Sequence, residues 1–144
     1  MKANNKIKVS ADKISKSPVA HAVGRRKKSN ARVFLRHGTG KITVNKLESS
    51  KYLDTEISLM IASTPLNVCE EAKSFDIEVN VAGGGKVAQA DAVKLGFSRA
   101  LVEFNSELEP VLRDHGLLTV DSRVKERKKY GQRGARRKFQ FVKR

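Results

Sequence analysis

Cysteine and tryptophan are the scarcest residue types in this sequence, which has one cysteine and no tryptophan among 144 residues. A single cysteine, Cys69, excludes an internal disulfide and is typical of proteins from a reducing compartment. Its neighbours in the chain are apolar or acidic and give no reason for a lowered thiol pKa. We therefore predict that Cys69 is a small core residue and not a reactive thiol.

Long apolar runs and clusters of catalytic residue types are also missing from the sequence. No run of eighteen apolar residues exists, and the N-terminal residues lack the apolar stretch of a secretory signal. The histidines His21, His37 and His115 are scattered and show no metal-ligand spacing with one another or with Cys69. Neither a Ser/His/Asp set nor a pair of carboxylates stands out. We predict no enzymatic activity, no metal, no cofactor and no small-molecule substrate.

Acidic residues are almost absent from the end of the chain, where residues 122–144 carry eleven Lys or Arg and one acid, Glu126. Such a segment has few apolar side chains to bury, and its charges repel one another, so it cannot fold by itself. It needs an anionic partner. A polyphosphate backbone is the partner that best suits the planar fork of arginine.

The charges along the whole chain are strongly segregated. Residues 1–50 carry a net charge of +11, residues 51–121 a net charge of −6, and residues 122–144 a net charge of +10. A mildly acidic middle thus lies between two basic arms. This distribution is typical of proteins that bind nucleic acid, and less often of proteins that bind an anionic membrane.

Hydrophobic periodicity divides the chain into three parts. We predict a disordered basic leader over residues 1–20, a globular RNA-binding domain over residues 21–121, and an extended basic tail over residues 122–144. Alternation of apolar and polar residues predicts strands over 31–36, 41–45 and 75–81. The first two strands flank a Gly-rich turn and are expected to pair as a β-hairpin.

Three helices are predicted within the domain. The first begins near Thr55 with Asp54 as its N-cap, and Pro65 should end or kink it near Ser63. Its apolar side is expected to consist of Ile57, Met60 and Ile61. A long helix over 86–105 has a core-facing stripe of Ala90, Val93, Phe97, Ala100, Leu101 and Phe104. With a short helix over 107–114, these elements predict an α+β fold, a small sheet with helices on one face.

The segment Gly83-Gly84-Gly85 lies between a predicted strand and the long helix. Its GxGxxA spacing is a weak match to dinucleotide-binding loops, and Glu103, at the spacing of the acid those loops require, lies inside the helix. No Gly-Lys-Ser/Thr follows, so the segment is not a P-loop. Two compatible interpretations remain. The glycines make a tight turn, and their exposed amides hold an RNA phosphate at the helix N-terminus.

Basic residues form further candidate RNA contacts. A basic cluster precedes residues 31–36, and two more arginines share one face of that strand. The tail adds a third group, in which Tyr130 and Phe139 are placed to stack on bases. The predicted phosphate contacts in these three groups are Arg25, Arg26, Lys27, Lys28, Arg32, Arg36, Arg123, Arg127, Lys128, Lys129, Arg133, Arg136 and Arg137.

Several motifs together resemble the ninth protein of the small ribosomal subunit in its bacterial and organellar form. They are GRRK leading to ARV from Gly24, GGGKVAQA from Gly83 with GFSRAL from Gly96, and GLLT from Gly116 followed by DSR, ERKK and ARR. The resemblance covers residues 20–144 in order. Departures are Ser122 in place of proline, Ala88 in place of glycine, Val142 in place of serine, and a longer leader.

The resemblance implies a structural protein of the small subunit with a mixed four-stranded sheet, like that of the second domain of the fifth small-subunit protein, and a left-handed βαβ crossover. It implies binding to the rRNA of the head, with Gln89 and Arg99 in the matching motifs among the contacts, and proximity to other head proteins. The tail would reach the anticodon stem-loop of P-site tRNA through Phe141, Lys143 and Arg144. The expected location is a bacterial-type cytoplasmic ribosome or an organellar ribosome.

Two other functions are compatible with a small basic protein. One is the protein subunit of ribonuclease P or another basic RNA chaperone, whose arginine-rich motif belongs on a helix, whereas the basic clusters here flank a strand and fill a tail. The other is a membrane-surface binder that uses its polybasic tail.

Overall fold

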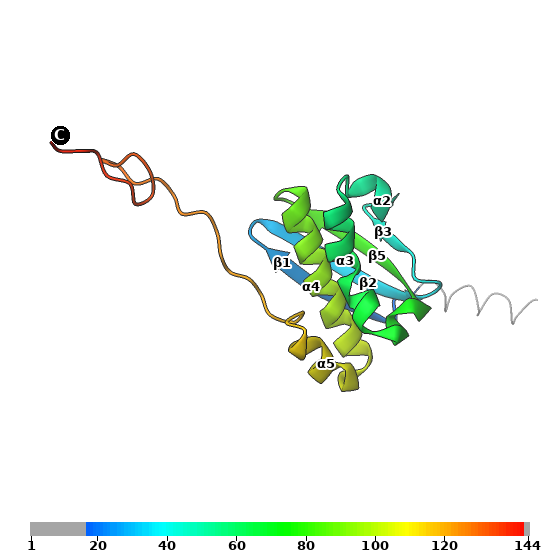
Figure 1. Ribbon diagram of the computed structural model, residues 1–144. Coiled ribbons are helices and arrows are strands. Elements are labelled where there is room, and N and C mark those ends of the chain that lie inside the picture. The colour runs from blue at the N-terminus through cyan, green and yellow to red at the C-terminus, as the bar shows by residue number, and fades with distance from the viewer. Residues whose placement is uncertain (1–16, 143–144) are drawn as a thin grey trace, which may run out of the picture.

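A computed structural model describes residues 17–142 of the chain. Its centre is a five-stranded mixed sheet with the strand order β1-β2-β5-β3-β4 (Figure 1). The strands β1, β2 and β5 are antiparallel neighbours, whereas β3 runs parallel to β5. The strand bounds are β1 Ala20–Arg26, β2 Ser29–His37, β3 Ile42–Val44, β4 Leu47–Glu48 and β5 Phe75–Ala82.

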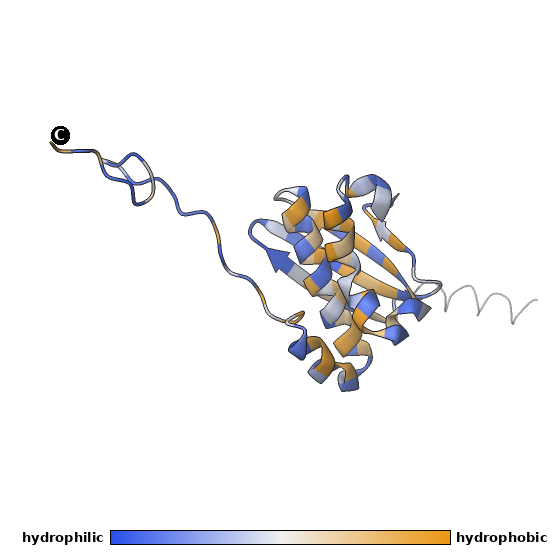
Figure 2. Cartoon of the chain, viewed as in Figure 1, coloured by the Kyte–Doolittle hydropathy of each residue, from blue (hydrophilic) through white to orange (hydrophobic). Residues whose placement is uncertain are grey.

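The two longest helices cover one face of this sheet, which confirms the predicted α+β class (Figure 1). Helix α4 packs on β1 and β2, and α3 packs beside it. Figure 2 shows hydrophobic residues concentrated in the strands and helices of this domain, while the C-terminal segment is mostly hydrophilic. The helices are α2 Ser49–Tyr52, α3 Glu56–Val68, α4 Lys86–Phe104 and α5 Glu109–Asp114, with 3-10 turns η1 Glu70–Ser74 and η2 Ser106–Leu108.

The elements with the clearest periodicity lie where they were predicted. In β5 the side chains that face the helices are buried, and the alternating side chains are more exposed to solvent. Helix α4 buries its predicted stripe except for Phe104, which is 42% exposed and packs its ring edge on Phe75 at 4.7 Å between centroids. Cys69 is buried, as predicted, and burial raises the pKa of its thiol. Strand β1 begins at Ala20, one residue before the predicted boundary of the domain, and residues 1–16 of the predicted leader lie outside the described residues.

The predicted hairpin of the strands before and after residues 37–40 is wrong. Strand β5 lies between β2 and β3 and hydrogen-bonds to both of them. Strand β5 has a longer apolar inner face than β3, which has only three residues, and so pairs with β2 over its whole length. The segment 38–40 instead crosses the end of β5, where the Asp76 carboxylate accepts backbone N–H groups from Thr39 (2.8 Å) and Lys41 (3.1 Å).

Helix α3 also differs from its prediction. It continues through Pro65 to Val68, and its N-cap is Thr55 instead of Asp54. Its buried side is Ser58, Ala62 and Pro65, whereas Ile57 and Met60 are exposed. Helix α3 packs against α4, and the small side chains on its buried side suit a close approach of two helices.

Gly24 explains how β1 comes to lie against α4. A Cβ atom added at Gly24 would lie closer than 3.0 Å to the Ala92 carbonyl oxygen and to the backbone nitrogen of Gly96. The strand and the helix therefore touch backbone to backbone, which requires glycine on both sides. This contact fixes the end of β1, and with it the turn that follows.

The Asp76 contacts predict an acid-dependent part of the stability. Hydrogen bonds from the Thr39 amide, and then from Lys41 and Gly40, hold the pKa of the Asp76 carboxyl below its ordinary value. This carboxylate therefore stabilises the fold above the pKa of an unfolded aspartate, about 4, and its contribution is lost as the pH falls through the lower folded pKa. Asp76→Asn should cost about 1 kcal/mol at pH 7 and progressively less below pH 4.

Urea unfolding of the full chain between pH 3 and pH 7 measures this difference. The control is Glu48→Gln, since Glu48 is exposed and forms no salt bridge within residues 17–142. A free-energy difference between Asp76→Asn and the parent that stays constant across this pH range would contradict the assignment.

Candidate nucleic-acid interface

The glycine loop and the basic turn, far apart in the sequence, form one surface. The hydroxyl of Ser29, at the start of β2, donates to the Gly83 carbonyl at 3.0 Å. Gly83 and Gly84 have φ angles of +75° and +67°, which favour glycine. A Cβ atom on Gly84 would meet the Ser29 side chain closer than 3.0 Å. The loop is therefore pressed against the turn that joins β1 and β2.

The N-terminus of α4 opens on this surface. Gly85 is its N-cap, makes no side-chain capping hydrogen bond, and is followed by a first turn without acidic residues. The first backbone N–H groups of a helix have no partner within the helix, and its dipole places partial positive charge there. In a helix of nineteen residues these groups form a ready site for an anion such as a phosphate.

Basic side chains surround that helix end. Lys27 and Lys28 occupy the β1–β2 turn and are exposed, and Lys27 adopts a positive φ of 54°. Neither lysine forms a salt bridge with an acid of residues 17–142. The loop amides and these two ammonium groups thus present positive charge on the same side of the molecule. We call residues 27, 28 and 83–85 the loop–turn site.

The open face of the sheet extends the positive surface. Arg32 and Arg36 project from β2 on this face, as predicted from their spacing. Arg32 is exposed and lies across from Asn80 of β5, while Arg36 forms a salt bridge with Glu78 at 3.1 Å. Arg25 of β1 is exposed as well. Charge on this face is therefore strongest at the end near the loop–turn site and partly neutralised towards Arg36.

Two residues that the sequence placed among the RNA contacts are engaged inside the protein. Gln89 is 8% exposed, donates to the Gly83 carbonyl at 3.0 Å and accepts the Tyr52 hydroxyl at 3.0 Å. Gln89 therefore holds the glycine loop in place from helix α4. The Arg26 side chain is 14% exposed and pairs with Asp121 at 3.0 Å and Asp91 at 3.6 Å. Neither side chain is open to a phosphate in this arrangement.

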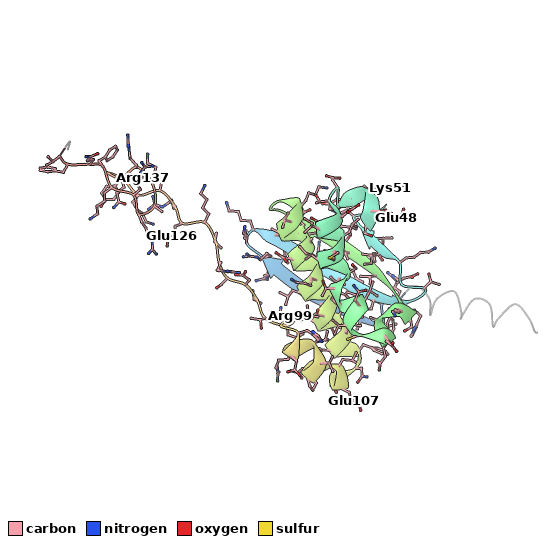
Figure 3. All side chains as sticks on the ribbon, in the orientation of Figure 1. Glu48, Lys51, Arg99, Glu107, Glu126 and Arg137 are labelled. Carbon is pink, nitrogen blue, oxygen red and sulfur yellow. The ribbon has the colours of Figure 1, made fainter. Side chains whose placement is uncertain are left out.

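Arg99 lies apart from the loop–turn site. It is exposed on the later part of α4 (Figure 3), and its guanidinium donates to the Val23 carbonyl at 3.1 Å. Thirteen residues of helix separate it from Lys86, a distance of about 20 Å at the usual helical rise. Any RNA contact of Arg99 is therefore separate from the contacts of the glycine loop.

The C-terminal segment leaves the domain as an extended chain and ends in a small loop (Figures 1 and 3). The loop is closed by Glu126, which accepts two hydrogen bonds from the Arg136 guanidinium at 2.6 and 2.9 Å. The Arg133 amide donates to the Arg137 carbonyl at 2.8 Å. Sequence reasoning missed this loop, although its signal is the one acid in a basic segment.

The basic side chains of the described tail are all exposed, and two of them, Arg123 and Arg136, are paired with Asp121 and Glu126. They are Arg123, Lys125, Arg127, Lys128, Lys129, Arg133, Arg136, Arg137 and Lys138. Phe141 is fully exposed. Lys143 and Arg144, the predicted tip contacts, lie outside the described residues.

Within residues 17–142, no group of three or more His, Cys, Asp or Glu side chains is arranged to hold a metal ion. None of the helices in the same range is long and apolar enough to cross a membrane.

Comparison with known proteins decides the family. The family model described as "Ribosomal protein S9/S16" matches residues 24–144. The chain belongs to this family of ribosomal proteins. It is 53% identical over 126 residues to the small ribosomal subunit protein uS9 of Cytophaga hutchinsonii, a match that covers 88% of this chain and 98% of the relative.

Other relatives agree with this assignment. The small ribosomal subunit protein uS9 of Chlorobaculum parvum is 52% identical over 126 residues, and that of Phocaeicola vulgatus is 49% identical over 126 residues, each match covering 88% of this chain and 98% of the relative. The chain is thus a structural protein of the small ribosomal subunit, an RNA-binding ribonucleoprotein component and not an enzyme. The resemblance seen in the sequence is confirmed, and the ribonuclease P and membrane alternatives are set aside.

The geometry of the glycine loop predicts different effects at neighbouring positions. Gly84→Ala should lower the free energy of unfolding by roughly 1–2 kcal/mol, the cost of a side chain in the left-handed region, and should displace Ser29. Gly85→Ala is the matched control, because Gly85 has a negative φ of −111° and an added Cβ meets nothing within 4 Å. Urea unfolding of both variants measures the difference. Equal stabilities would show that the turn does not need its positive φ.

Proposed function

We propose that the loop–turn site is the main contact of this protein with the rRNA of the small-subunit head. The observation that carries the proposal is the convergence of an uncapped helix N-terminus with two lysines that form no salt bridge within residues 17–142. A phosphate at the Gly84 and Gly85 amides would gain hydrogen bonds from the backbone and favourable interactions with both ammonium groups. An RNA backbone can approach this loop closely because the glycines have no side chains.

The open face of the sheet supplies further phosphate contacts in this proposal. Arg25 and Arg32 lie next to the loop–turn site and are exposed, and Arg36 extends the row along β2. Arg26 and Gln89 are left out of this set, because their polar atoms already bind Asp121 and Gly83. Arg99 marks a second, separate contact on α4.

The tail has a different role in the proposal. It neutralises packed rRNA phosphates along its basic stretch and presents its last residues to the anticodon stem-loop of P-site tRNA. Its length supports this role, since residues 122–144 span up to about 75 Å when extended. The exposed ring of Phe141 is available to stack, and the resemblance places Lys143 and Arg144 at the tRNA.

The surroundings of the protein in this proposal are a bacterial-type ribosome in the cytoplasm, with neighbouring head proteins as additional partners. An organellar ribosome of bacterial type is the alternative. The relatives named above support the first choice, because they come from bacteria.

Salt dependence tests the rRNA contact. With six or more phosphates contacted, the plot of log K against log salt for a head-domain rRNA fragment should have a slope on the order of −4 or steeper. Lys27→Gln/Lys28→Gln should make this slope shallower by about 1.4–1.8, because each phosphate contact contributes about 0.7–0.9. Filter binding of the free protein between 50 and about 300 mM salt covers the range in which these contacts weaken.

The control for this test removes two lysines at the far end of the domain. Lys41→Gln/Lys73→Gln changes the net charge by the same amount but lies beyond the opposite end of β2 and β5, about 20–25 Å away. Its slope should match that of the parent. Equal losses of slope in the two double variants would mean that net charge, and not the loop–turn site, governs binding.

Removal of residues 141–144 tests the tRNA contact. Subunits that carry this deletion should form in normal yield, because the phosphate contacts for assembly are spread over the domain and the earlier tail. Their affinity for an anticodon stem-loop should fall by about 1–3 kcal/mol, or roughly five- to a hundredfold. Arg144→Ala should weaken binding more than the control Val142→Ala, since valine donates no hydrogen bond. Unchanged stem-loop affinity would leave the tail as an rRNA contact only.

A further inference from the structure

Arg26 is the most enclosed basic side chain near the point where the tail leaves the domain. Its Nη1 donates to the backbone carbonyls of Asp121 (3.2 Å) and Arg123 (2.7 Å), which lie more than ninety residues further along the chain. Its Nη2 lies 3.0 Å from the Asp121 carboxylate, and its Nε lies 3.6 Å from the Asp91 carboxylate. One guanidinium thus joins the end of β1, helix α4 and the first residues of the tail.

The groups around Arg26 are themselves paired. Asp121 also binds the Arg123 side chain through three hydrogen bonds of 2.7 to 3.1 Å, and its carboxylate accepts the Arg123 amide at 2.9 Å. Hydrogen bonding by Arg123, with a smaller contribution from the charge of Arg26, holds the pKa of the Asp121 carboxyl well below its usual range. Asp91 pairs with Lys94 at 3.3 Å. The Asp121 carboxylate is therefore charged at neutral pH and available to both arginines.

We propose that Arg26 is a positioning residue that clamps the start of the tail to the edge of the domain and so sets the direction in which the tail leaves. In an extended chain the carbonyls of residues two apart point to the same side, and one planar guanidinium reaches both. Holding Asp121 and Arg123 in this way fixes the backbone across Ser122. The freely moving part of the tail then begins after Arg123 and not at Ser122.

This clamp has a consequence for binding, which rests on the function proposed above. A tail that leaves the domain in a fixed direction loses less conformational freedom on binding its RNA than one that leaves in any direction. Arg26 therefore acts on RNA affinity through the tail without touching a phosphate.

Backbone order parameters of the free full-length protein test the clamp without RNA. In the parent, the amides of Ser122 and Arg123 should have order parameters near 0.8, falling below about 0.6 further along the tail. Arg26→Gln should lower the values at both residues below about 0.6 and leave the domain unchanged. Arg25→Gln is the matched control for order. It removes the same charge from the neighbouring residue, which lines the same pocket as Asp121 and Arg123 but forms no hydrogen bond or salt bridge with the described part of the tail.

Two further variants keep the test decisive if Arg26→Gln does not fold. Arg26→Lys keeps the positive charge but lacks the planar guanidinium that reaches several acceptors at once, so the order parameters at Ser122 and Arg123 should still fall. Asp121→Asn leaves the core untouched and should loosen Arg123 in particular. If Ser122 and Arg123 are as ordered in all folded variants as in the parent, or are already flexible in the parent, the proposal is wrong.

RNA binding separates this proposal from the function proposed above. Arg26→Gln should weaken binding of the full chain to a head-domain rRNA fragment by a few-fold while leaving the salt slope within about 0.3 of the parent. A slope that becomes shallower by about 0.7–0.9 would show that Arg26 contacts a phosphate, which would overturn its positioning role but leave the RNA contact intact. Loss of tail order in Arg26→Gln with no rRNA binding by the parent would support the clamp and refute the proposed function instead.

Discussion

Repulsion among thirty basic side chains is the constraint on which the structure depends. Acidic side chains or an apolar core offset that repulsion within the domain, and several of the acids in residues 17–142 pair with arginines. Asp121 and Asp91 hold Arg26, Glu78 holds Arg36, and Glu126 holds Arg136. An arginine with an acidic partner marks a place where the chain must keep its shape.

Basic residues without such a partner show the opposite use of charge. Lys27, Lys28 and Arg32 form no salt bridge within residues 17–142. The two lysines lie in the turn beside the glycine loop, and Arg32 lies on the open face of the sheet. Their repulsion is relieved when an anion binds, so the same charges that oppose folding favour association with RNA. The exposed basic side chains of the tail favour association with RNA in the same way. A salt bridge does not by itself exclude an RNA contact, since Arg36 and Arg136 are paired with acids and still reach the surface, whereas Arg26 is enclosed.

The sequence predicted those elements whose burial follows from their own periodicity. Strand β5 and helix α4 have clear repeats of two and of three to four residues, and both lie where the pattern placed them. Features that depend on distant residues were missed. Strand β5 lies between β2 and β3. Alternation of apolar and polar residues predicts that a segment is a strand, but it does not determine which strands pair. Helix α3 continues through Pro65 because packing against α4 outweighs the local preference.

The candidate site also has one part that the sequence predicted and another that it did not. Its residue types and its two segments were visible in the sequence, since a charge cluster and a glycine loop are local features. Their contact through Ser29 and Gly83 joins residues 54 positions apart and required the fold. The contacts of Arg26 inside the protein could not be predicted for the same reason, because its partners Asp121 and Arg123 lie more than ninety residues further along the chain.

Crosslinking of the protein to RNA within purified small subunits tests the central claim most directly. Ultraviolet irradiation followed by mass spectrometry of the crosslinked peptides identifies the side of the protein that faces rRNA. The account predicts crosslinks in residues 25–32, 83–86 and 123–137, and none around Lys41 or Lys73. Crosslinks concentrated on the exposed side of α3, around Ile57 and Met60, with none at the loop–turn site, would contradict it.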